Sequence, residues 1–227
     1  MQRAHPAVRG LILAAALLAA GTRVVAQSPA GFGTCSPRSE RGGRAAGCFT
    51  ITEQALGTLG TEPVFWHVTA FASRARADSA AAGMGPGVTV VEAFDTAWVF
   101  RIAGADRHPA RGTEIAVIGP LPVTPGVAYS ALYMEASMTP GMKSMVHRHS
   151  GPEAWYTFAG ETCLETPGGT QVGRAGGPPV IVPGGLPMEL TATGTAIRKS
   201  LVLILHDASQ PPTRMETAWK PSGLCSR

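Results

Sequence analysis

Residues 141–160 read GMKSMVHRHSGPEAWYTFAG and hold His147 and His149, two residues apart, followed by Glu153. Residues i and i+2 of a β-strand point to the same face, so both imidazoles are expected to project into one space. Ser150-Gly151-Pro152 is typical of a turn, after which a second strand would start at Glu153 and return its carboxylate to that space. Two imidazoles and one carboxylate are the donors of the facial triad of non-haem iron, and they also suit manganese, zinc, nickel or copper.

The residues around these donors follow a regular spacing. Five residues separate Gly141 from the first histidine, and six separate the glutamate from Gly160. Further along, a second pattern reads Gly, five residues, Pro-x-Gly, two residues, Met, and it is filled by Gly177, Pro183, Gly185 and Met188. The two patterns resemble the two conserved motifs of the cupin superfamily, except that the family has histidine where Met188 stands.

This resemblance implies a fold and a set of ligands. The implied fold is all-β, a double-stranded β-helix or jelly-roll-like barrel over residues 125–208. The implied metal ligands are His147, His149, Glu153 and Met188. A thioether favours Cu(I) and contributes little to the binding of Mn, Fe(II) or Zn. A divalent transition metal would therefore be bound mainly by the first three donors. The choice among Fe, Mn, Zn, Ni and Cu stays open, and the alternative is a metal-free barrel whose buried polar groups pair with each other and with water.

Other side chains near the motif are candidates for the cavity wall. Met145 is in phase with the two histidines and Trp155 is in phase with Glu153, so both are expected to line the cavity beside the polar cluster, or simply to fill the core. His206 ends the apolar segment 201–205 and could approach the place that Met188 occupies. A histidine at a strand end is more often capped or solvated.

Polar residues farther away receive no functional role from the sequence. His67, beside Trp66, is expected to be a core or surface histidine, and His108 lies in a polar loop. Arg198 and Lys199 alternate at the start of an apolar segment, which predicts a solvated strand face.

The rest of the chain is punctuated by 28 glycines and 19 prolines. Between them lie short segments rich in Val, Ile, Thr and aromatic residues, which is typical of an all-β sandwich or barrel. One Ala-rich helix is expected at 74–82. The proline-rich stretch 119–126 separates a strand-rich region, 48–124, from the barrel. That region is either an extension of the barrel or a degenerate second barrel.

The N-terminus has the features of an export signal. Residues 1–26 combine Arg3 and Arg9 with an apolar run at 11–20 and a small residue, Ala26, suited to cleavage. The run is too short to span a bilayer, so no membrane span is expected. Without this segment 16 basic residues face 15 acidic ones, which argues against a nucleic-acid binder. We therefore expect a periplasmic or extracellular protein, and the chain resembles exported cupin-domain proteins of unknown role.

Four cysteines in an exported protein indicate disulfides, for which three pairings are possible. We favour Cys35 with Cys48, which would tether a segment at 27–47 rich in Gly, Arg and Ser. Closing such a loop stabilises the fold by roughly 3 kcal/mol in the chain-entropy model. We pair Cys163 with Cys225, which would tie the tail, 209–227, to the barrel.

Three functions fit these features. The first is an enzyme whose metal acts on a small molecule in the barrel, for which the resemblance implies oxygenase-like chemistry, with isomerase or lyase chemistry next. No further catalytic residue is assigned. The second is a protein that binds a small ligand or copper without turnover. The third is a metal-free structural cupin, since such barrels commonly form homodimers through edge strands.

Overall fold

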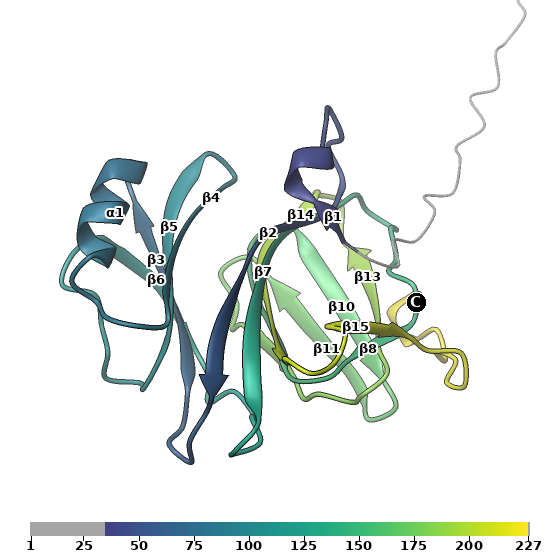
Figure 1. Cartoon of the computed structure of the whole chain (residues 1–227). Helices are drawn as coiled ribbons and strands as arrows, with labels where there is room; N and C mark the ends of the chain where they lie inside the picture. The colour runs from purple at the N-terminus through teal and green to yellow at the C-terminus, as the bar shows by residue number, and fades with distance from the viewer. Residues whose placement is uncertain (1–34, 227) are drawn as a thin grey trace, which may run out of the picture.

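A computed structural model describes residues 35–226, which form a predominantly β structure. At its centre lies a six-stranded sheet of order β1-β2-β7-β14-β9-β12 (Figure 1). Its strands are β1 (Ser36–Pro37), β2 (Gly47–Thr58), β7 (Ala128–Met138), β14 (Arg198–Asp207), β9 (Glu153–Ala159) and β12 (Val180–Val182). This sheet is shared by two layers of the molecule, because both of its faces are covered.

A smaller layer of strands faces this sheet and closes the barrel. Strand β10 pairs with β11 on one side and β13 on the other, and β8 pairs with β15. Backbone hydrogen bonds from Ser144 to Leu190, and between His147 and Met188 in both directions, join β13 to the segment that leads into β8. The all-β barrel predicted from the sequence is confirmed. The strands of this layer are β8 (His147–His149), β10 (Glu161–Thr166), β11 (Gly169–Arg174), β13 (Glu189–Thr193) and β15 (Thr213–Met215).

Strand β14 shows why the barrel needs an outer cover. Val202 and Ile204 point into the barrel, whereas Leu201, Leu203 and Leu205 belong to a second apolar cluster on the opposite face. A continuous apolar run of this kind is typical of a strand that is buried on both sides. Something other than water must therefore pack on the outside of the central sheet.

That cover is a four-stranded antiparallel sheet of order β4-β5-β3-β6. Figure 1 shows it beside the barrel, with β2 and β7 between the two halves. The interface is rich in aromatic side chains: the ring centroids of Trp66 and Phe100 are 5.2 Å apart, and those of Phe100 and Tyr133 are 5.0 Å apart. Its strands are β3 (Phe65–Phe71), β4 (Val88–Ala93), β5 (Thr96–Ala103) and β6 (Thr113–Ile118).

The far face of this four-stranded sheet carries the helix α1 (Arg74–Ala81), where a helix was expected. Ser73 caps its N-terminus by accepting a hydrogen bond from the backbone N–H of Arg76, and Ala77 packs on the sheet with Phe71 and Val99. Because β3 to β6 form an open sheet with a helix on one side, this region is an extension and not a second barrel. The structure thus resolves the alternative that the sequence left open.

Strand β2 is the longest strand and is absent from the sequence-based prediction. It pairs with β7 with register shifts between Thr50 and Thr52 and between Ala55 and Gly57. Each irregularity changes which residues face the barrel, so the segment has no clean alternation of apolar and polar residues. The pairing nevertheless places β2 in the central sheet of the barrel.

Both predicted disulfides are confirmed, Cys35 with Cys48 and Cys163 with Cys225. The first joins β2 to the chain just before β1 and the short 3-10 helix η1 (Arg38–Glu40). The second joins β10 to the 3-10 helix η2 (Leu224–Ser226) near the C-terminus.

The predicted signal peptide, 1–26, lies outside the described residues. Among the residues that the structure does describe, no helix is long and apolar enough to cross a membrane. The two disulfides are compatible with a periplasmic or extracellular location, where such bonds form and persist.

Candidate metal centre

Strand β8 directs two histidine rings into the barrel. His147 and His149 are 7% and 4% exposed, and their ring centroids lie 4.9 Å apart. The strand is only three residues long, but both of its edges are paired: His147 exchanges backbone hydrogen bonds with Met188, and β15 runs along the other edge. The convergence expected from the His-x-His spacing is present.

Glu153 is brought to these rings by a tight turn. A Cβ atom on Gly151 would lie 2.0 Å from the carbonyl oxygen of Leu205, and one on Gly184 would lie 2.6 Å from the Cα of Gly151, so both positions require glycine. The chain can therefore reverse directly into β9, whose first residue is Glu153. Its Oε2 lies 3.4 Å from Nε2 of His149.

Backbone carbonyl groups set the orientation and tautomer of both rings. Nδ1 of His147 lies 2.7 Å from the carbonyl oxygen of Met145, and Nδ1 of His149 lies 2.8 Å from that of Pro212. A carbonyl oxygen only accepts hydrogen bonds, so each Nδ1 must carry the proton and donate it. In a neutral ring Nε2 is then left as an acceptor, which is the arrangement found in metal-binding histidines.

The buried environment also determines the protonation states of His147 and Glu153. Burial lowers the pKa of His147, and the neighbouring His149 lowers it further, which favours the neutral ring. Burial alone would raise the pKa of the Glu153 carboxyl. The neighbouring His149 side chain, followed by His147 and Arg198, outweighs that effect, so the pKa falls below its usual value and the group is an anion.

The donor atoms of His147, His149 and Glu153 all lie within 4.8 Å of one another. Nε2 of His149 and Oε2 of Glu153 are buried without any hydrogen-bond partner. Buried polar atoms are almost always paired, and a cation between these two atoms would satisfy both of them. These three residues therefore fit a bound metal ion, whose identity the donor set does not determine.

Met188 lies directly across from His147 in a bridged antiparallel pair. Residues opposite each other in such a pair have their side chains on the same face. Met188 is 1% exposed and belongs to the core inside the barrel. Its side chain is therefore on the side of the candidate centre, although it is not among the residues that line the adjoining cavity.

The cavity next to the three donors measures about 40 Å³. That is roughly three times the space that one water molecule needs. One part of its wall is the Cys35–Cys48 disulfide, and most of the remainder is apolar. Its lining residues are Cys35, Cys48, Met134, Ala136, His147, His149, Glu153, Leu190, Arg198, Val202, Ile204 and Thr213.

Two of the side chains considered as neighbours of the site lie elsewhere. Met145 is 50% exposed, so the prediction that it lines the cavity is wrong: β8 begins only at His147, and the strand alternation does not extend back to Met145. His206 pairs through Nε2 with the Glu53 carboxylate at 2.9 Å and is not part of the donor group. Trp155 is fully buried in the barrel core, on the face that also carries Glu153.

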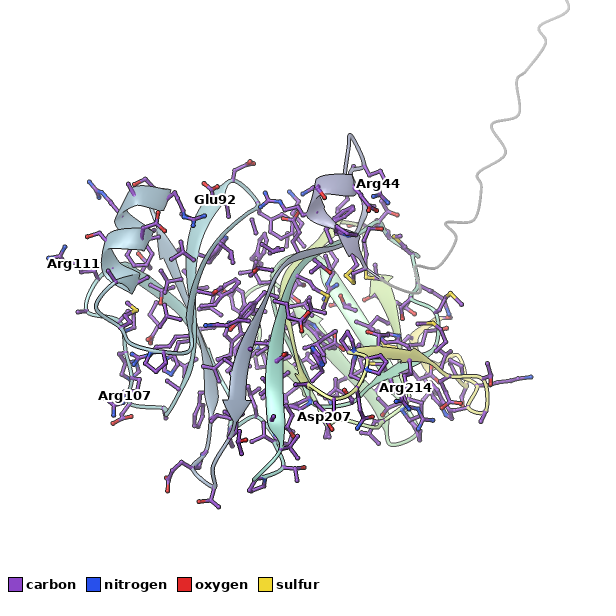
Figure 2. The ribbon with its side chains drawn as sticks, in the orientation of Figure 1. Arg44, Glu92, Arg107, Arg111, Asp207 and Arg214 are labelled. Atoms are coloured by element: carbon purple, nitrogen blue, oxygen red, sulfur yellow. A yellow bond between two sulfur atoms is a disulfide. The ribbon has the colours of Figure 1, made fainter. Side chains whose placement is uncertain are left out.

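The prediction of a solvated face at Arg198 and Lys199 is wrong for Arg198. Lys199 is exposed, but Arg198 is 1% exposed and lines the cavity. The arginines labelled in Figure 2, such as Arg44 and Arg107, reach the outside of the molecule instead. Arg198 shares a strand face with Val202 and Ile204, and that alternation is the sequence signal that points it inward.

A second group with the same residue types lies on the four-stranded sheet. The donor atoms of His67, His108 and Glu114 also lie within 4.8 Å of one another. His67 is buried, whereas the side chains of His108 and Glu114 are 61% and 31% exposed. The sequence did not bring these residues together, because His108 lies in a loop and the pairing of β3 with β6 was unknown.

The turn of the second sequence pattern packs against the histidine strand. The backbone N–H of Gly185 donates to the carbonyl oxygen of His149 at 2.8 Å, while Met188 pairs with His147. Both patterns thus meet around one three-donor group inside a closed barrel of two facing sheets, which is the arrangement that the cupin motifs imply. The barrel has the double-stranded β-helix fold that those motifs imply. An outer sheet and helix, β3 to β6 with α1, are added to it.

Solved structures similar to this barrel cover only part of the chain. A cupin-like protein from Thermotoga maritima has 14% identity and a TM-score of 0.35, over 38% of this chain and 64% of that protein. A protein with a double-stranded β-helix domain from Klebsiella pneumoniae has 17% identity and a TM-score of 0.32, over 37% and 69%. An oxalate oxidase in complex with the substrate analogue glycolate has 19% identity and a TM-score of 0.31, over 37% and 45%.

The match spans less than two thirds of the length of the first and third of these proteins. The chain matches no family model, and no curated protein matches it.

Proposed function

We propose that this chain is an exported cupin that binds a divalent transition metal through His147, His149 and Glu153, with Met188 beside them, and that acts on a small molecule in the barrel. The observation that carries the proposal is the orientation of the two rings. Each Nδ1–H donates to a backbone carbonyl, so each Nε2 is free for a metal.

The donor set also bears on the type of chemistry. Two imidazoles and one carboxylate leave coordination positions open, as in non-haem iron oxygenases. When bound, such a metal supplies Lewis acidity and, if it is redox-active, reactivity toward dioxygen. Oxygenase-like activity is therefore the first reaction class to assay, with isomerase and lyase reactions next.

The chain's own residues supply position and a dry environment. The carbonyl groups of Met145 and Pro212 hold the rings, and the apolar side chains of Leu190, Val202 and Ile204 limit the water beside them. Apart from the three donors, Arg198 is the one ionisable side chain among the cavity-lining residues, because both cysteines are disulfide-bonded. Proton transfer by a separate side chain is thus poorly supported, and Glu153 is the one carboxylate available.

A second candidate function is copper binding without turnover. It is favoured by the position of Met188, whose side chain lies on the same face as His147 in a bridged pair. A thioether adds affinity for Cu(I) and little for harder ions. Replacing Met188 with leucine would then abolish any preference for Cu(I) while leaving divalent metal binding in place.

Metal content and metal-dependent stability test the proposal. Purified protein is expected to carry one transition-metal ion per chain. Added metal at 100 times its Kd should stabilise the fold by about 2.7 kcal/mol, because it binds only the folded state. Both effects should be absent in His147→Ala and retained in His206→Ala, a matched variant at a buried barrel histidine outside the donor group.

Absence of stoichiometric metal, together with no rise of the melting temperature in Mn, Fe, Zn, Cu or Ni, would contradict the proposal. It would leave the metal-free structural cupin as the better description.

A further inference from the structure

Arg198 is a fully buried cation inside the barrel. It is the first residue of β14 and lines the same cavity as the three metal-site donors. Its guanidinium lies 5.8 Å from the ring centroid of Trp155, and Nη1 lies 3.6 Å from the Met138 sulfur. Neither contact supplies an anion, and a thioether is only a weak acceptor.

The remaining guanidinium nitrogens have no partner among the described residues. Nε and Nη2 of Arg198 are both buried and make no hydrogen bond. No carboxylate of the described chain lies within ion-pair distance, and Glu153 acts on Arg198 only as a more distant charge. Burial lowers the pKa of Arg198 to about 10, so the group stays protonated at neutral pH. A buried charge without a partner is strongly destabilising, which indicates that a partner is supplied from outside the chain.

The local charge identifies the sign of that partner. The cavity is lined by one carboxylate, Glu153, and one guanidinium, Arg198. A divalent metal would raise the net charge of the cavity to about two positive charges. An apolar surround strengthens the attraction of such a site for an anion. Guanidinium groups in particular match the planar, two-oxygen geometry of a carboxylate.

The backbone holds Arg198 in this inward position. Gly160, at the end of the first sequence pattern, has φ +67°, and a Cβ there would lie 2.6 Å from the Cα of Arg198. The β9–β10 turn therefore passes directly over the start of β14. A larger residue at position 160 would displace Arg198, so this glycine serves the cavity as well as the turn.

We propose that Arg198 anchors the carboxylate of the substrate, and that the substrate is a small carboxylic acid with a second oxygen donor directed at His147, His149 and Glu153. This inference rests on the proposed function and names its substrate class. The cavity of about 40 Å³ restricts the ligand to a compact acid of two or three carbons, such as a 2-hydroxy or 2-oxo acid.

Binding of glycolate, the smallest 2-hydroxy acid, tests the proposal, with glycolamide as its neutral counterpart. Isothermal titration of the metal-loaded protein should show glycolate binding and at least 10-fold weaker binding of glycolamide. Arg198→Met, which keeps the volume but removes the charge, should weaken glycolate binding by roughly 10- to 100-fold. Arg198→Lys should recover part of the loss, since it keeps the charge but not the paired N–H donors of the guanidinium group. Lys199→Met, at the exposed position next to Arg198 on the same strand, should bind glycolate as the native chain does.

Metal content, measured on each variant, separates this proposal from the proposed function. Arg198→Met is expected to keep its metal, since Arg198 is not a donor. If the native chain carries no metal, the proposed function fails. The carboxylate anchor would still be supported if the metal-free chain bound glycolate and Arg198→Met abolished that binding. Three results would overturn the anchor: no binding of glycolate to the native chain, equal binding of glycolate and glycolamide, or unchanged glycolate affinity in a folded, metal-loaded Arg198→Met variant.

Discussion

The barrel and the four-stranded sheet each bring two histidines and one glutamate together, in different surroundings. In the barrel, the side chains of His149 and Glu153 are 3% and 7% exposed, and their facing atoms have no hydrogen-bond partner. On the sheet, Nδ1 of His108 already hydrogen-bonds the carboxylate of Glu114 at 2.8 Å, and both side chains reach water. In the sheet group Nδ1 of His67 is also buried without a partner, but the other two members, His108 and Glu114, already pair with each other.

Preorganisation, more than composition, therefore separates the two groups. In the barrel group both Nδ1 atoms are engaged by carbonyl groups, and β8 is paired with β15 on one edge and bridged to Met188 on the other. In the sheet group only His67 is held in this way, through Nε2 to the carbonyl of Gly104. A metal that bound there would have to break the His108–Glu114 pair and order a loop, so its affinity should be much lower.

The largest expected effect is the loss of a barrel ligand. Glu153→Gln keeps the shape of the side chain and removes its charge. It should weaken metal binding by more than about 1,000-fold, because the loss of a residue that only hydrogen-bonds a ligand already weakens binding by about 10- to 100-fold. Glu114→Gln, the matched change on the sheet, should leave metal affinity unchanged. Competition with a chromophoric chelator measures both. A loss of metal affinity in Glu114→Gln and none in Glu153→Gln would mean that the sheet group holds the metal.

The next effect concerns the Cys35–Cys48 disulfide, which lines the cavity beside the barrel group. Among the described residues, no disulfide lies beside the sheet group. Replacing Cys35 and Cys48 with serine should lower the free energy of unfolding by roughly 3 kcal/mol, the loop-closure value for a span of this length. Metal should also dissociate faster, because the wall beside the donors is no longer tethered. Urea unfolding and stopped-flow metal release are the measurements. An unchanged release rate would show that this wall does not control access.

A smaller effect is expected from the ion pair that joins β8 to the residue after β15. Arg148 and Glu216 form this pair, and β15 follows directly on Pro212, whose carbonyl orients His149. Glu216→Gln should weaken metal binding by about 10-fold or less, as for other outer partners, with little change in stability. Asp78→Asn, which breaks the exposed Arg74–Asp78 pair on α1, is the control and should leave metal binding as it is. Identical metal affinities in the two variants would show that the Arg148–Glu216 pair beside β15 does not contribute to metal binding.

The smallest effect is a pH dependence on the sheet. Burial lowers the pKa of His67 below 6.5, so the folded chain keeps this ring neutral where the unfolded chain takes up a proton. The unfolded state therefore binds more protons as the pH falls through 6.5, and the free energy of unfolding should decrease. His67→Gln, which keeps a donor for Gly104 without titrating, should flatten this slope in urea titrations at a series of pH values. The same slope in both chains would show that His67 does not contribute.

The sequence predicts the barrel and its donors well because the relevant contacts are local. His147 and His149 share a strand face, and Glu153 follows after one turn, so strand alternation alone places three side chains together. The disulfides are less local: three pairings were possible, and the favoured one rests on the need to hold a Gly-rich segment and a tail.

The features that the sequence did not predict depend on long-range pairing. Whether Arg198 faces water or a cavity depends on β14 lying at the centre of a sheet covered on both sides. The register shifts of β2 hide its alternation, and Met145 was placed in the cavity by extending a strand that begins only at His147. The His67 group exists only because β3 pairs with β6 and a loop returns beside them.

Anomalous diffraction from crystals of the metal-loaded protein would locate the bound ion. We predict one strong peak inside the barrel, about 2.0–2.2 Å from Nε2 of His147, Nε2 of His149 and a carboxylate oxygen of Glu153. The group of His67, His108 and Glu114 should show no peak of comparable height. A peak at the sheet group alone, or a barrel in which Nε2 of His149 donates a proton to Glu153 with no metal between them, would contradict this prediction.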